Sequence, residues 1–595
     1  MANWLLRHTD ADIKLMGKTL GVSENLALIL AHRGIRSRNA AVKFLRPEMK
    51  FLNDIRAMKD MDGACRLISE SVKAGEKIFV YGDYDADGVM STVILLKTLR
   101  DFGADVQFYI PLREEEGYGL NIDAVRRIRA NGGQLIITCD NGVSAFNEID
   151  EARALGMKTA VIDHHEPGFT ENGDGKRTDV IPRADRVVDP KQQACGYAFK
   201  EYCAAGLCYR FAEAFYAYNG REFGHRDEFL TLAAFATICD IVPLMDENRI
   251  LVRAGLETLK QNKKINLGLW SLMKAKNIQD KALGVFDIGF LLGPCVNASG
   301  RLANAADAVR LFLSDDPDEA AELAQGLAEL NERRKDMTAK AVDVVLKALA
   351  EREPDKVLVI YNEEVHESIA GIVAGRIRES FCRPVIMLTR SDDLAKGSAR
   401  SIEGYNIFEA LYSHKDLLLR FGGHAMAAGL SLSAENIGLL RQQLNEACVL
   451  TEKDFSPVLY VERGLQPQYA TYELTKELEL LAPFGRDNPE PLFEADGLKP
   501  EQLRMINDKN TMIFTFGVAD SYRKIRAVCF GMNNAFTERI RGLFDAYDSG
   551  KILAGILRAA DFLMDVVYAL EINEYNNNVS VQMRIKDFHI YRSQG

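Results

Sequence analysis

The chain has 595 residues, of which 47% are hydrophobic and 27% charged, and its formal net charge is −11. This length exceeds what one hydrophobic core usually organises, so we expect about three or four globular domains. The acidic balance excludes a generally basic coat for nucleic acid, although a local basic groove stays compatible with it.

Membrane and secretory classes are also disfavoured. No uncharged apolar run reaches the roughly 18 residues of a membrane span, and charges come too early at the N-terminus for a secretory signal. The ten cysteines are scattered without a CxxC pair. That pattern predicts free thiols in a reducing compartment, and hence a cytoplasmic location.

The first half of the chain predicts a parallel sheet. Residues 1–70 have the pattern of short helices with polar breaks and form the expected N-terminal helical region. From 71 to 315, an apolar strand at 77–82 is followed by an acidic loop and a helix, and strands and helices then alternate. Such alternation predicts a parallel α/β sheet, in which ligands bind beyond the carboxyl ends of the strands.

The second half predicts two further domains. Residues 316–350 form one long helical pattern, long enough to join two lobes. A second α/β segment follows at 351–452. Short strands and turn signals at 453–595 predict a small β-rich domain of the barrel class.

The loop "GDYDADG" follows the first strand and carries Asp83, Asp85 and Asp87. One aspartate is explained as a helix N-cap. Three together repel one another unless a cation compensates them, which favours a metal site. The spacing resembles a calcium-binding EF-hand loop, but the glutamate that such a loop needs at its twelfth position is missing.

Three other strand or helix ends carry candidate ligands, in "ITCDNG" (Asp140), "VIDHHEP" (Asp163, His164 and His165) and "TICDIVPL" (Asp240). Each aspartate alone also fits a turn or a helix cap. Together they make a mixed oxygen and nitrogen set that suits Mg²⁺ or Mn²⁺, with histidine favouring Mn²⁺. Two such ions about 3.5–4 Å apart would deliver hydroxide to a phosphodiester. A zinc hydrolase is disfavoured because no HExxH motif is present.

The ordered motifs resemble a known family. "GDYDADG", "CDNG", "DHH" and "CDIVPL" are similar to the DHH phosphoesterase superfamily, and "GSARS" (397–401) and "GGHAMAAG" (422–429) resemble its DHHA1 partner domain. "PFGRDNPEPLF" (483–493) resembles the OB-fold domain of the RecJ exonucleases. The similarity covers nearly the whole chain from about residue 20.

The resemblance implies an α/β fold in which a long helix joins a parallel-sheet DHH domain to a DHHA1 domain, with a C-terminal OB-like domain. It also implies a 5′→3′ exonuclease that uses two Mn²⁺ or Mg²⁺ ions and releases 5′-mononucleotides from single-stranded DNA in recombination and repair. Asp83 and Asp163 would orient ligands, and Asp140 would bridge the ions. The implied metal and catalytic residues are Asp85, Asp87, Asp140, His164, His165 and Asp240.

Two positions depart from the family pattern. Tyr81 stands where many relatives have histidine, so the first ion is expected to be held more weakly, because a phenol is a poor ligand at neutral pH. In "GPCVNASGR", Cys295 stands where the RecJ-like motif has arginine, so one phosphate contact is expected to be missing.

The resemblance also implies a set of strand-binding residues. Glycines let backbone N–H groups approach phosphates, although GGH alone also fits a tight turn. Arg113 lies among glutamates and fits a surface ion pair equally well. In the tail, rings interleave with cations as base stacking requires, but the rings equally suit a barrel core. The tail residues are Phe514, Phe516, Tyr522, Arg523, Lys524 and Arg526. The implied strand-binding residues are Arg113, Asn297, Arg301, Ser398, Arg400, Ser401, Gly422, Gly423 and His424.

Single-stranded DNA is therefore the expected partner, with a single-stranded-DNA-binding protein and a helicase as further candidates and no membrane. One alternative is a DHH-family phosphodiesterase that cleaves short oligoribonucleotides or cyclic dinucleotides, which is disfavoured by the OB-like tail. Another is a catalytically silent DNA-binding scaffold, which is disfavoured by the retained ligands.

Overall fold

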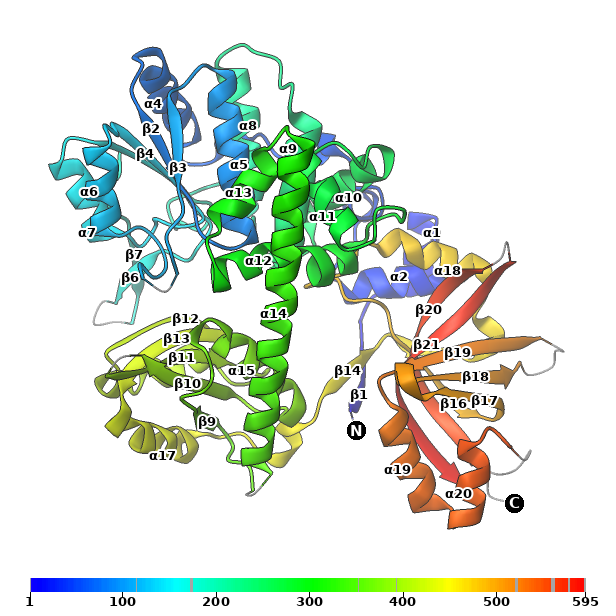
Figure 1. Ribbon diagram of the computed structural model, residues 1–595. Coiled ribbons are helices and arrows are strands. Elements are labelled where there is room, and N and C mark those ends of the chain that lie inside the picture. The colour runs from blue at the N-terminus through cyan, green and yellow to red at the C-terminus, as the bar shows by residue number, and fades with distance from the viewer. Residues whose placement is uncertain are drawn as a thin grey trace. The chain divides into compact units, whose positions relative to one another are not determined.

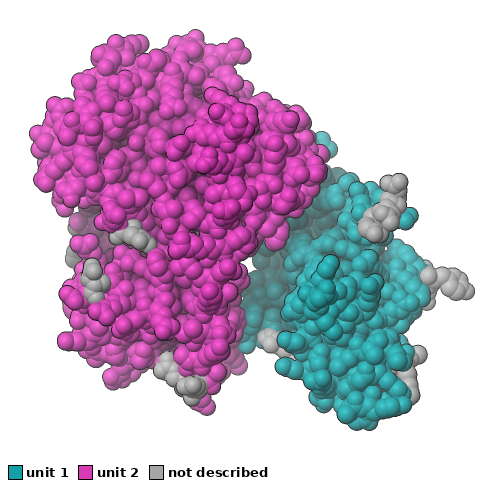
Figure 2. Space-filling model, viewed as in Figure 1, with its two compact units in different colours: residues 1–46, 456–484, 488–595 teal, residues 47–455, 485–487 magenta. Residues whose placement is uncertain are grey.

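The chain folds into two compact units. The first comprises Met1–Arg46, Ser456–Phe484 and Asn488–Gly595, and the second comprises Pro47–Phe455 and Gly485–Asp487 (Figure 2). None of the described helices combines the length and apolar character needed to cross a membrane. The computed structural model describes residues 2–113, 115–171, 175–350, 353–391, 393–518, 523–557, 562–575 and 578–592.

The first lobe of the second unit is built on a five-stranded sheet, and every neighbouring pair in it is parallel, as predicted (Figure 1). The spatial order β3-β2-β4-β5-β8 reverses direction between β2 and β4. Such a reversal opens a crevice at the carboxyl ends of the two strands. The strands are β2 (Ile78–Tyr81), β3 (Val106–Tyr109), β4 (Leu135–Cys139), β5 (Lys158–Ile162) and β8 (Arg186–Val188).

Helices cover both faces of this sheet because its side chains alternate between two cores. Ile78 and Val80 belong to the larger core, and Phe79 and Tyr81 belong to the smaller one. On the larger side pack α4 (Met61–Lys73), α5 (Ala86–Asp101), α8 (Ala204–Tyr218) and α9 (Arg226–Cys239), and on the smaller side α6 (Ile122–Ala130) and α7 (Phe146–Ala154).

Further short elements complete the first lobe. The strands β6 and β7 form an antiparallel pair, and the remaining helices extend the larger core. These elements are β6 (Gly168–Glu171), β7 (Arg177–Val180), α10 (Asp246–Gln261), α11 (Leu267–Ala275), the π-helix η3 (Asp287–Leu292), α12 (Gly293–Leu302) and α13 (Ala306–Leu313).

The helix expected at 316–350 is α14 (Pro317–Leu349). Its 33 residues span about 50 Å. Leu327 packs in the core of the first lobe, whereas Val345 and Leu349 pack in a core of the second. The helix therefore belongs to both lobes and joins them (Figure 1).

The second lobe carries a five-stranded mixed sheet of order β12-β13-β11-β10-β9, in which only β9 and β10 are parallel neighbours. α15 covers one face, and α16 and α17 cover the other. The elements are β9 (Leu358–Tyr361), α15 (Glu367–Phe381), β10 (Val385–Ser391), β11 (Leu394–Arg400), α16 (Ile407–Tyr412), β12 (Arg420–His424), β13 (Ala427–Ser433) and α17 (Ile437–Ala447).

The first unit combines the two ends of the sequence. β1 pairs in parallel with β14, and Arg33 Nε donates to Asn488 Oδ1 at 2.8 Å. The tail forms a seven-stranded sheet of order β15-β16-β20-β21-β19-β18-β17. The strands are β1 (Asn3–Leu6), β14 (Val458–Val461), β15 (Arg463–Gly464), β16 (Phe493–Leu498), β17 (Pro500–Ile506), β18 (Thr511–Gly517), β19 (Lys524–Phe530), β20 (Phe562–Tyr575) and β21 (Asn578–Arg592). The helices are α1 (Ile13–Leu20), α2 (Glu24–His32), α3 (Arg38–Leu45), α18 (Tyr472–Leu478), α19 (Asn533–Leu543) and α20 (Ala546–Leu553).

Two of the tail rings suggested for base stacking are core residues. Phe514 and Phe516 are fully buried and stack on each other, because alternate positions of β18 share one face. Arg523 Nη2 donates to the Pro467 carbonyl, and Lys524 pairs with Glu501 at 2.7 Å. Tyr522 lies outside the described residues, and Arg526 is exposed.

Candidate active site

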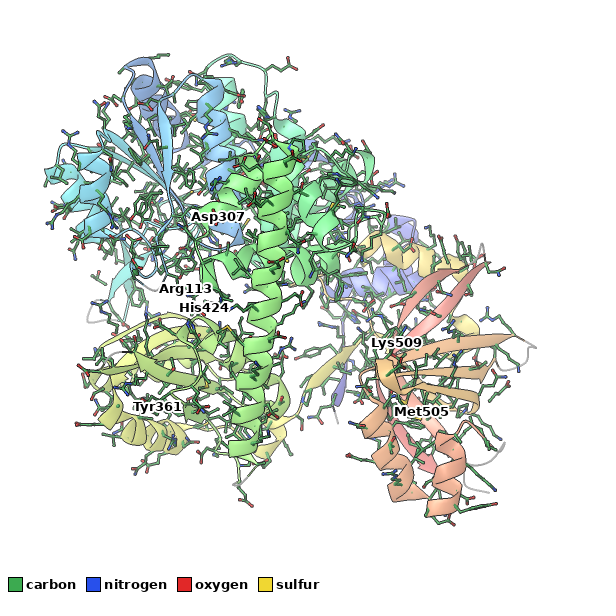
Figure 3. All side chains as sticks on the ribbon, viewed as in Figure 1. Arg113, Asp307, Tyr361, His424, Met505 and Lys509 are labelled. Atoms are coloured by element: carbon green, nitrogen blue, oxygen red, sulfur yellow. The ribbon has the colours of Figure 1, made fainter. Side chains whose placement is uncertain are left out.

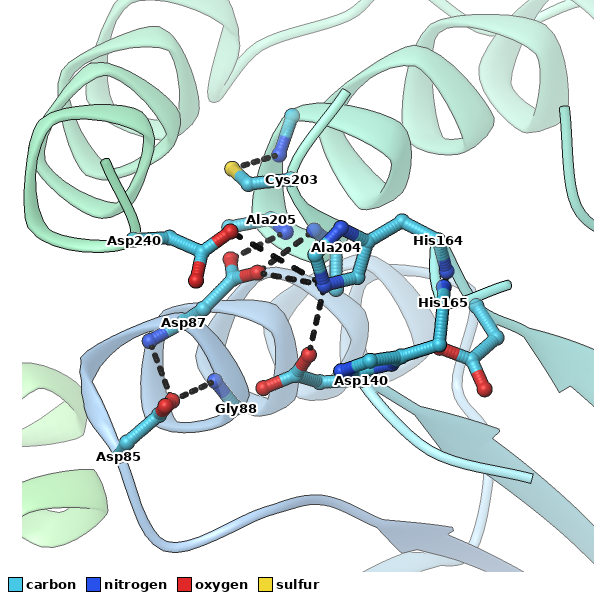
Figure 4. Close-up of polar contacts among 12 residues, drawn as sticks. Asp85, Asp87, Gly88, Asp140, His164, His165, Cys203, Ala204, Ala205 and Asp240 are labelled. Atoms are coloured by element: carbon cyan, nitrogen blue, oxygen red, sulfur yellow. Dashed lines mark hydrogen bonds and ion pairs between the residues drawn. The ribbon is translucent and has the colours of Figure 1, made fainter. Parts of the chain in front are cut away.

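Loops that follow β2, β4 and β5, together with the end of α9, bring the predicted metal ligands to one place at the carboxyl edge of the parallel sheet (Figure 4). Three overlapping groups are formed, and within each group the ligand atoms lie within 4.8 Å of one another. These groups are Asp140 with His164 and His165, Asp87 with His164 and Asp240, and Asp83 with Asp85 and Asp140.

His164 stands at the centre of the carboxylates. Its Nε2 lies 3.1 Å from Asp140 Oδ1, 3.6 Å from Asp87 Oδ2 and 4.0 Å from Asp240 Oδ2 (Figure 4). Burial, together with the charge of His165, lowers the pKa of His164 to about 3. The imidazole is therefore neutral at physiological pH, which is the form that binds a metal ion.

Asp163 holds the two histidines in place. Its Oδ1 lies 2.7 Å from His165 Nδ1 and accepts the His164 N–H at 2.8 Å, while its Oδ2 accepts the Val143 N–H at 2.9 Å. Burial would lower the pKa of His165, but the charge of Asp163 raises it to about 9. The same pairing holds the pKa of Asp163 below its usual range despite burial. This geometry suits the orienting role expected for Asp163.

The acidic loop is anchored by helix ends. Asp85 caps α5 and accepts the N–H groups of Asp87 at 2.9 Å and Gly88 at 3.1 Å. The Asp87 carboxylate accepts the N–H groups of Ala204 at 2.7 Å and Ala205 at 2.8 Å, which belong to the first turn of α8. Asp87 is thereby fixed by a helix N-terminus, which favours negative charge.

The carboxylates crowd together in a buried place. Burial, together with the charge of the neighbouring Asp85, raises the pKa of Asp87 to about 7. Burial, followed by the charges of nearby aspartates, also raises the pKa values of Asp140 and Asp240 well above the usual range. Asp83 Oδ1 is buried and has no hydrogen-bond partner in the described part of the chain. A divalent cation would satisfy this excess of negative charge.

Two residues of this region have no sequence motif that marks them. The Tyr118 hydroxyl donates to the Asp140 carbonyl at 3.0 Å and lies 3.2 Å from His165 Nε2. Asn248 Nδ2 donates to the carbonyls of Glu201 and Pro243, which ties the chain before α8 to the segment after Asp240. Only the position of Tyr118 in a polar, glycine-rich loop after β3 could have drawn attention to it.

Both departures from the family pattern are packed inside the protein. The Tyr81 side chain lies in the smaller core, where its hydroxyl donates to the Gly119 carbonyl at 3.0 Å. Cys295 is fully buried, with Sγ 3.3 Å from the Leu291 carbonyl oxygen and 3.5 Å from Asn331 Nδ2. Tyr81 is therefore a core residue, and Cys295 lies within the packing of α12 against α14.

Models of three domain families match the chain in order. The DHH family N-terminal domain matches residues 77–237, the DHHA1 domain 354–450 and the RecJ OB domain 461–587. The chain is 36% identical over 590 residues to the single-stranded-DNA-specific exonuclease RecJ of Bacillus subtilis (strain 168), covering 98% of this chain and 70% of that protein. It is 32% identical to the Escherichia coli (strain K12) protein of the same name, covering 94% of this chain and 95% of that one. The chain belongs to the RecJ family.

Solved RecJ structures share the fold. A crystal structure of Thermus thermophilus RecJ in complex with Mn²⁺ superposes with a TM-score of 0.79 at 26% identity, covering 99% of this chain and 79% of that one. The same protein in complex with Mg²⁺ gives a TM-score of 0.74. A RecJ exonuclease bound to manganese is 32% identical, with a TM-score of 0.56 over 68% of this chain and 97% of that one.

In this RecJ-family chain, α12 joins the acidic loop to the second lobe. Asn297 Oδ1 accepts the Ala86 N–H at 2.8 Å, and Arg301 Nη1 donates to the Ser368 carbonyl at 2.8 Å. A Cβ at Gly300 would lie 2.1 Å from the Tyr84 carbonyl oxygen, so only glycine allows this close approach. Asn297 and Arg301, expected to bind the strand, thus both bind the protein backbone here.

The other predicted strand-binding residues lie on both lobes. Arg113 stacks on the Tyr84 ring at 5.1 Å, on the edge of the first lobe that faces His424 (Figure 3). Arg400 Nη1 donates to Ser398 Oγ at 2.8 Å. Three further predicted residues make backbone contacts: Ser401 is fully buried and donates to the Tyr405 carbonyl, whereas Gly422 and Gly423 pair with Gly429 and Ala428 of β13.

The metal-free chain should lose stability as the pH rises from about 7 to about 9. Below this range the raised folded pKa values of Asp87, Asp140 and Asp240 give a slope of the same sign, because these groups keep protons that the unfolded chain has already released, and Asp87 releases its proton near pH 7. His165, with a raised pKa of about 9, acts in the same direction, because its stabilising charge is lost as the pH rises. Bound Mn²⁺ should remove most of this slope, since it requires the deprotonated carboxylates. Thermal unfolding in EDTA measures the loss of stability with pH, and thermal unfolding with Mn²⁺ measures how far the ion removes it. A metal-free chain whose unfolding temperature rises over this range would contradict the prediction.

Proposed function

We propose that the chain is a divalent-metal-dependent exonuclease that degrades single-stranded DNA from its 5′ end and releases 5′-mononucleotides. The observation that carries this proposal is the set of three overlapping carboxylate and histidine groups at the switch point of the parallel sheet. Membership of the RecJ family supplies the substrate class, since the curated relatives are named as single-stranded-DNA-specific exonucleases.

The donor set fits Mn²⁺ or Mg²⁺, because carboxylate oxygens predominate and histidine nitrogen completes it. Asp85, Asp87, Asp140, His164, His165 and Asp240 would hold two ions. When bound, the ions supply an activated hydroxide and neutralise charge that develops on the phosphate oxygens.

The chain's own side chains position these ligands and the strand. Asp163 fixes the orientation of His165, and the N-terminal turn of α8 fixes the Asp87 carboxylate. Arg113 and Arg400 would place positive charge near the phosphates, and His424 is exposed at the edge of the second lobe. Binding of the 5′ end by this second lobe would set the polarity of digestion.

The cellular setting is part of the proposal. All ten cysteines are free, which supports a reducing, cytoplasmic location. A single-stranded-DNA-binding protein and a helicase stay predicted partners in recombination and repair.

Digestion of oligonucleotides labelled at either end tests the function. With Mn²⁺, a 5′-labelled single strand should release labelled mononucleotide at once, whereas a 3′-labelled strand should shorten gradually, and duplex should resist. Preferential cleavage of short oligoribonucleotides or cyclic dinucleotides would favour the alternative phosphodiesterase. DNA binding without any cleavage would favour the silent scaffold.

A further inference from the structure

The loop Gly485–Asp487 belongs to the second unit although the chain on both sides of it folds into the first. The Leu244 N–H donates to the Arg486 carbonyl at 2.9 Å. A Cβ at Gly485 would lie 2.6 Å from Leu244 Cδ1, so the missing side chain allows the loop to pack closely. Leu244 is itself buried and lies shortly after Asp240 in the sequence. The backbone of the loop is thus fixed against the segment that carries a candidate metal ligand.

The side chain that this loop presents is a cation. Arg486 is exposed, and no carboxylate in the described part of the chain forms an ion pair with it. Burial lowers the pKa of His424, and among nearby charges that of Arg486 lowers it most, followed by those of Arg400 and Lys191. The positive charges of three cations from separate segments of the sequence therefore act on one imidazole at the surface.

Lys191 pairs with Glu166 at 3.3 Å, but Arg486 and Arg400 form no ion pair in the described part of the chain, so their like charges repel each other in the free protein. This arrangement becomes favourable when a polyanion displaces their counterions. Solubility alone does not require an arginine with a fixed backbone. The backbone of Arg486 is fixed by the buried Leu244 and by the close packing of Gly485.

We infer that Arg486 binds a backbone phosphate of the DNA strand beside His424. The inference rests on the proposed function and adds a residue from the "PFGRDNPEPLF" motif to the strand-binding surface. The guanidinium would donate charge-assisted hydrogen bonds to phosphate oxygens, while the carbonyl of the same residue keeps its bond to Leu244. Arg486 would thus be a substrate-binding residue that contacts no metal ion.

The test compares Arg486→Gln and Arg486→Lys with Arg100→Gln. Arg100 is also exposed, but it lies at the far end of α5, about 20 Å from Asp87. Steady-state digestion of single-stranded DNA with Mn²⁺ is measured over a range of salt concentrations, and Mn²⁺ binding to the free protein is measured separately. Because only the side chain changes and the backbone contact is kept, all three variants should fold.

Arg486→Gln should raise KM about tenfold with little change in kcat, because one charge-assisted contact is lost. The slope of log(kcat/KM) against log[salt] should become shallower by about 0.7, the value for one phosphate of a single strand. Arg486→Lys should keep the slope, and Mn²⁺ affinity should not change in any variant. Equal KM and slope for Arg486→Gln and Arg100→Gln would overturn the inference. So would a fall in kcat alone, because it would indicate an effect through the Asp240 segment. Inactivity of the unmodified chain would instead refute the proposed function.

Discussion

Replacing Asp140 by Asn should abolish degradation of single-stranded DNA and at the same time stabilise the metal-free chain. Asp140 belongs to two of the three candidate ligand groups, so its carboxylate lies near both the histidines and the acidic loop after β2. Its backbone has a φ of 63°, a left-handed conformation that asparagine also tolerates. The substitution therefore removes a charge while keeping the shape of the loop.

We expect kcat/KM to fall at least about 10³-fold, which corresponds to about 4 kcal/mol of transition-state stabilisation. The metal-free chain should gain about 1 kcal/mol or more, because one of several repelling buried carboxylates is gone. Asp150→Asn is the matched control, since Asp150 is a surface carboxylate paired with Arg183 at 2.6 Å. Digestion rates and denaturant unfolding in EDTA give the two readouts. Activity within tenfold of the unmodified chain, or a destabilised metal-free protein, would contradict this account.

The carboxylates that activity requires destabilise the metal-free fold. Residues kept for function rather than for folding are therefore the part of the site that the sequence makes recognisable. Function places several carboxylates and histidines at strand ends, where folding alone would use one capping residue. That excess is local, so Asp85, Asp140 and His164 could be predicted from short motifs. The parallel sheet that gathers them followed from the alternation of strands and helices.

What holds the ligands could not be predicted in this way. Asp87 is fixed by the N–H groups of Ala204 and Ala205, which lie far along the chain and carry no functional side chain. The docking of Gly485 against Leu244 likewise depends on the missing side chain of a distant residue. Backbone donors and close packing between remote segments leave no local pattern, so only the folded chain reveals them.

The sequence also left open whether the aromatic side chains of the tail are core or surface residues. Phe514 and Phe516 had to share a face, because side chains two positions apart on a strand do so. The sequence could not tell whether that face was core or surface. Their complete burial decides it, and it leaves Arg526 on the exposed side of the sheet.

The second large effect concerns stability. Glu247 is fully buried, and its carboxylate accepts hydrogen bonds from Arg210 Nη1 at 3.0 Å, from Tyr197 at 3.0 Å and from Tyr202. Glu247→Ala would leave the buried Arg210 guanidinium with Glu213, 2.9 Å from its Nε, as the remaining carboxylate partner, so we expect a cost of about 3 kcal/mol, at the lower end for a broken buried pair. Tyr202 lies two residues before Ala204, the start of the α8 turn that holds Asp87, so we also expect weaker Mn²⁺ binding.

Arg210→Met combined with Glu247→Leu separates the charge from the packing. Replacing both members of a buried ion pair by apolar residues of similar volume is often neutral, because neither charge is left uncompensated. The double variant should therefore recover most of the stability that Glu247→Ala loses, whereas Arg210→Met alone should resemble the destabilised single variant. Denaturant unfolding of the four proteins measures the free energies. A loss below about 1 kcal/mol for Glu247→Ala would show that the ion pair contributes little. A double variant as unstable as Glu247→Ala would show that hydrogen bonds to Tyr197 and Tyr202, rather than the paired charges, hold this part of the first lobe together.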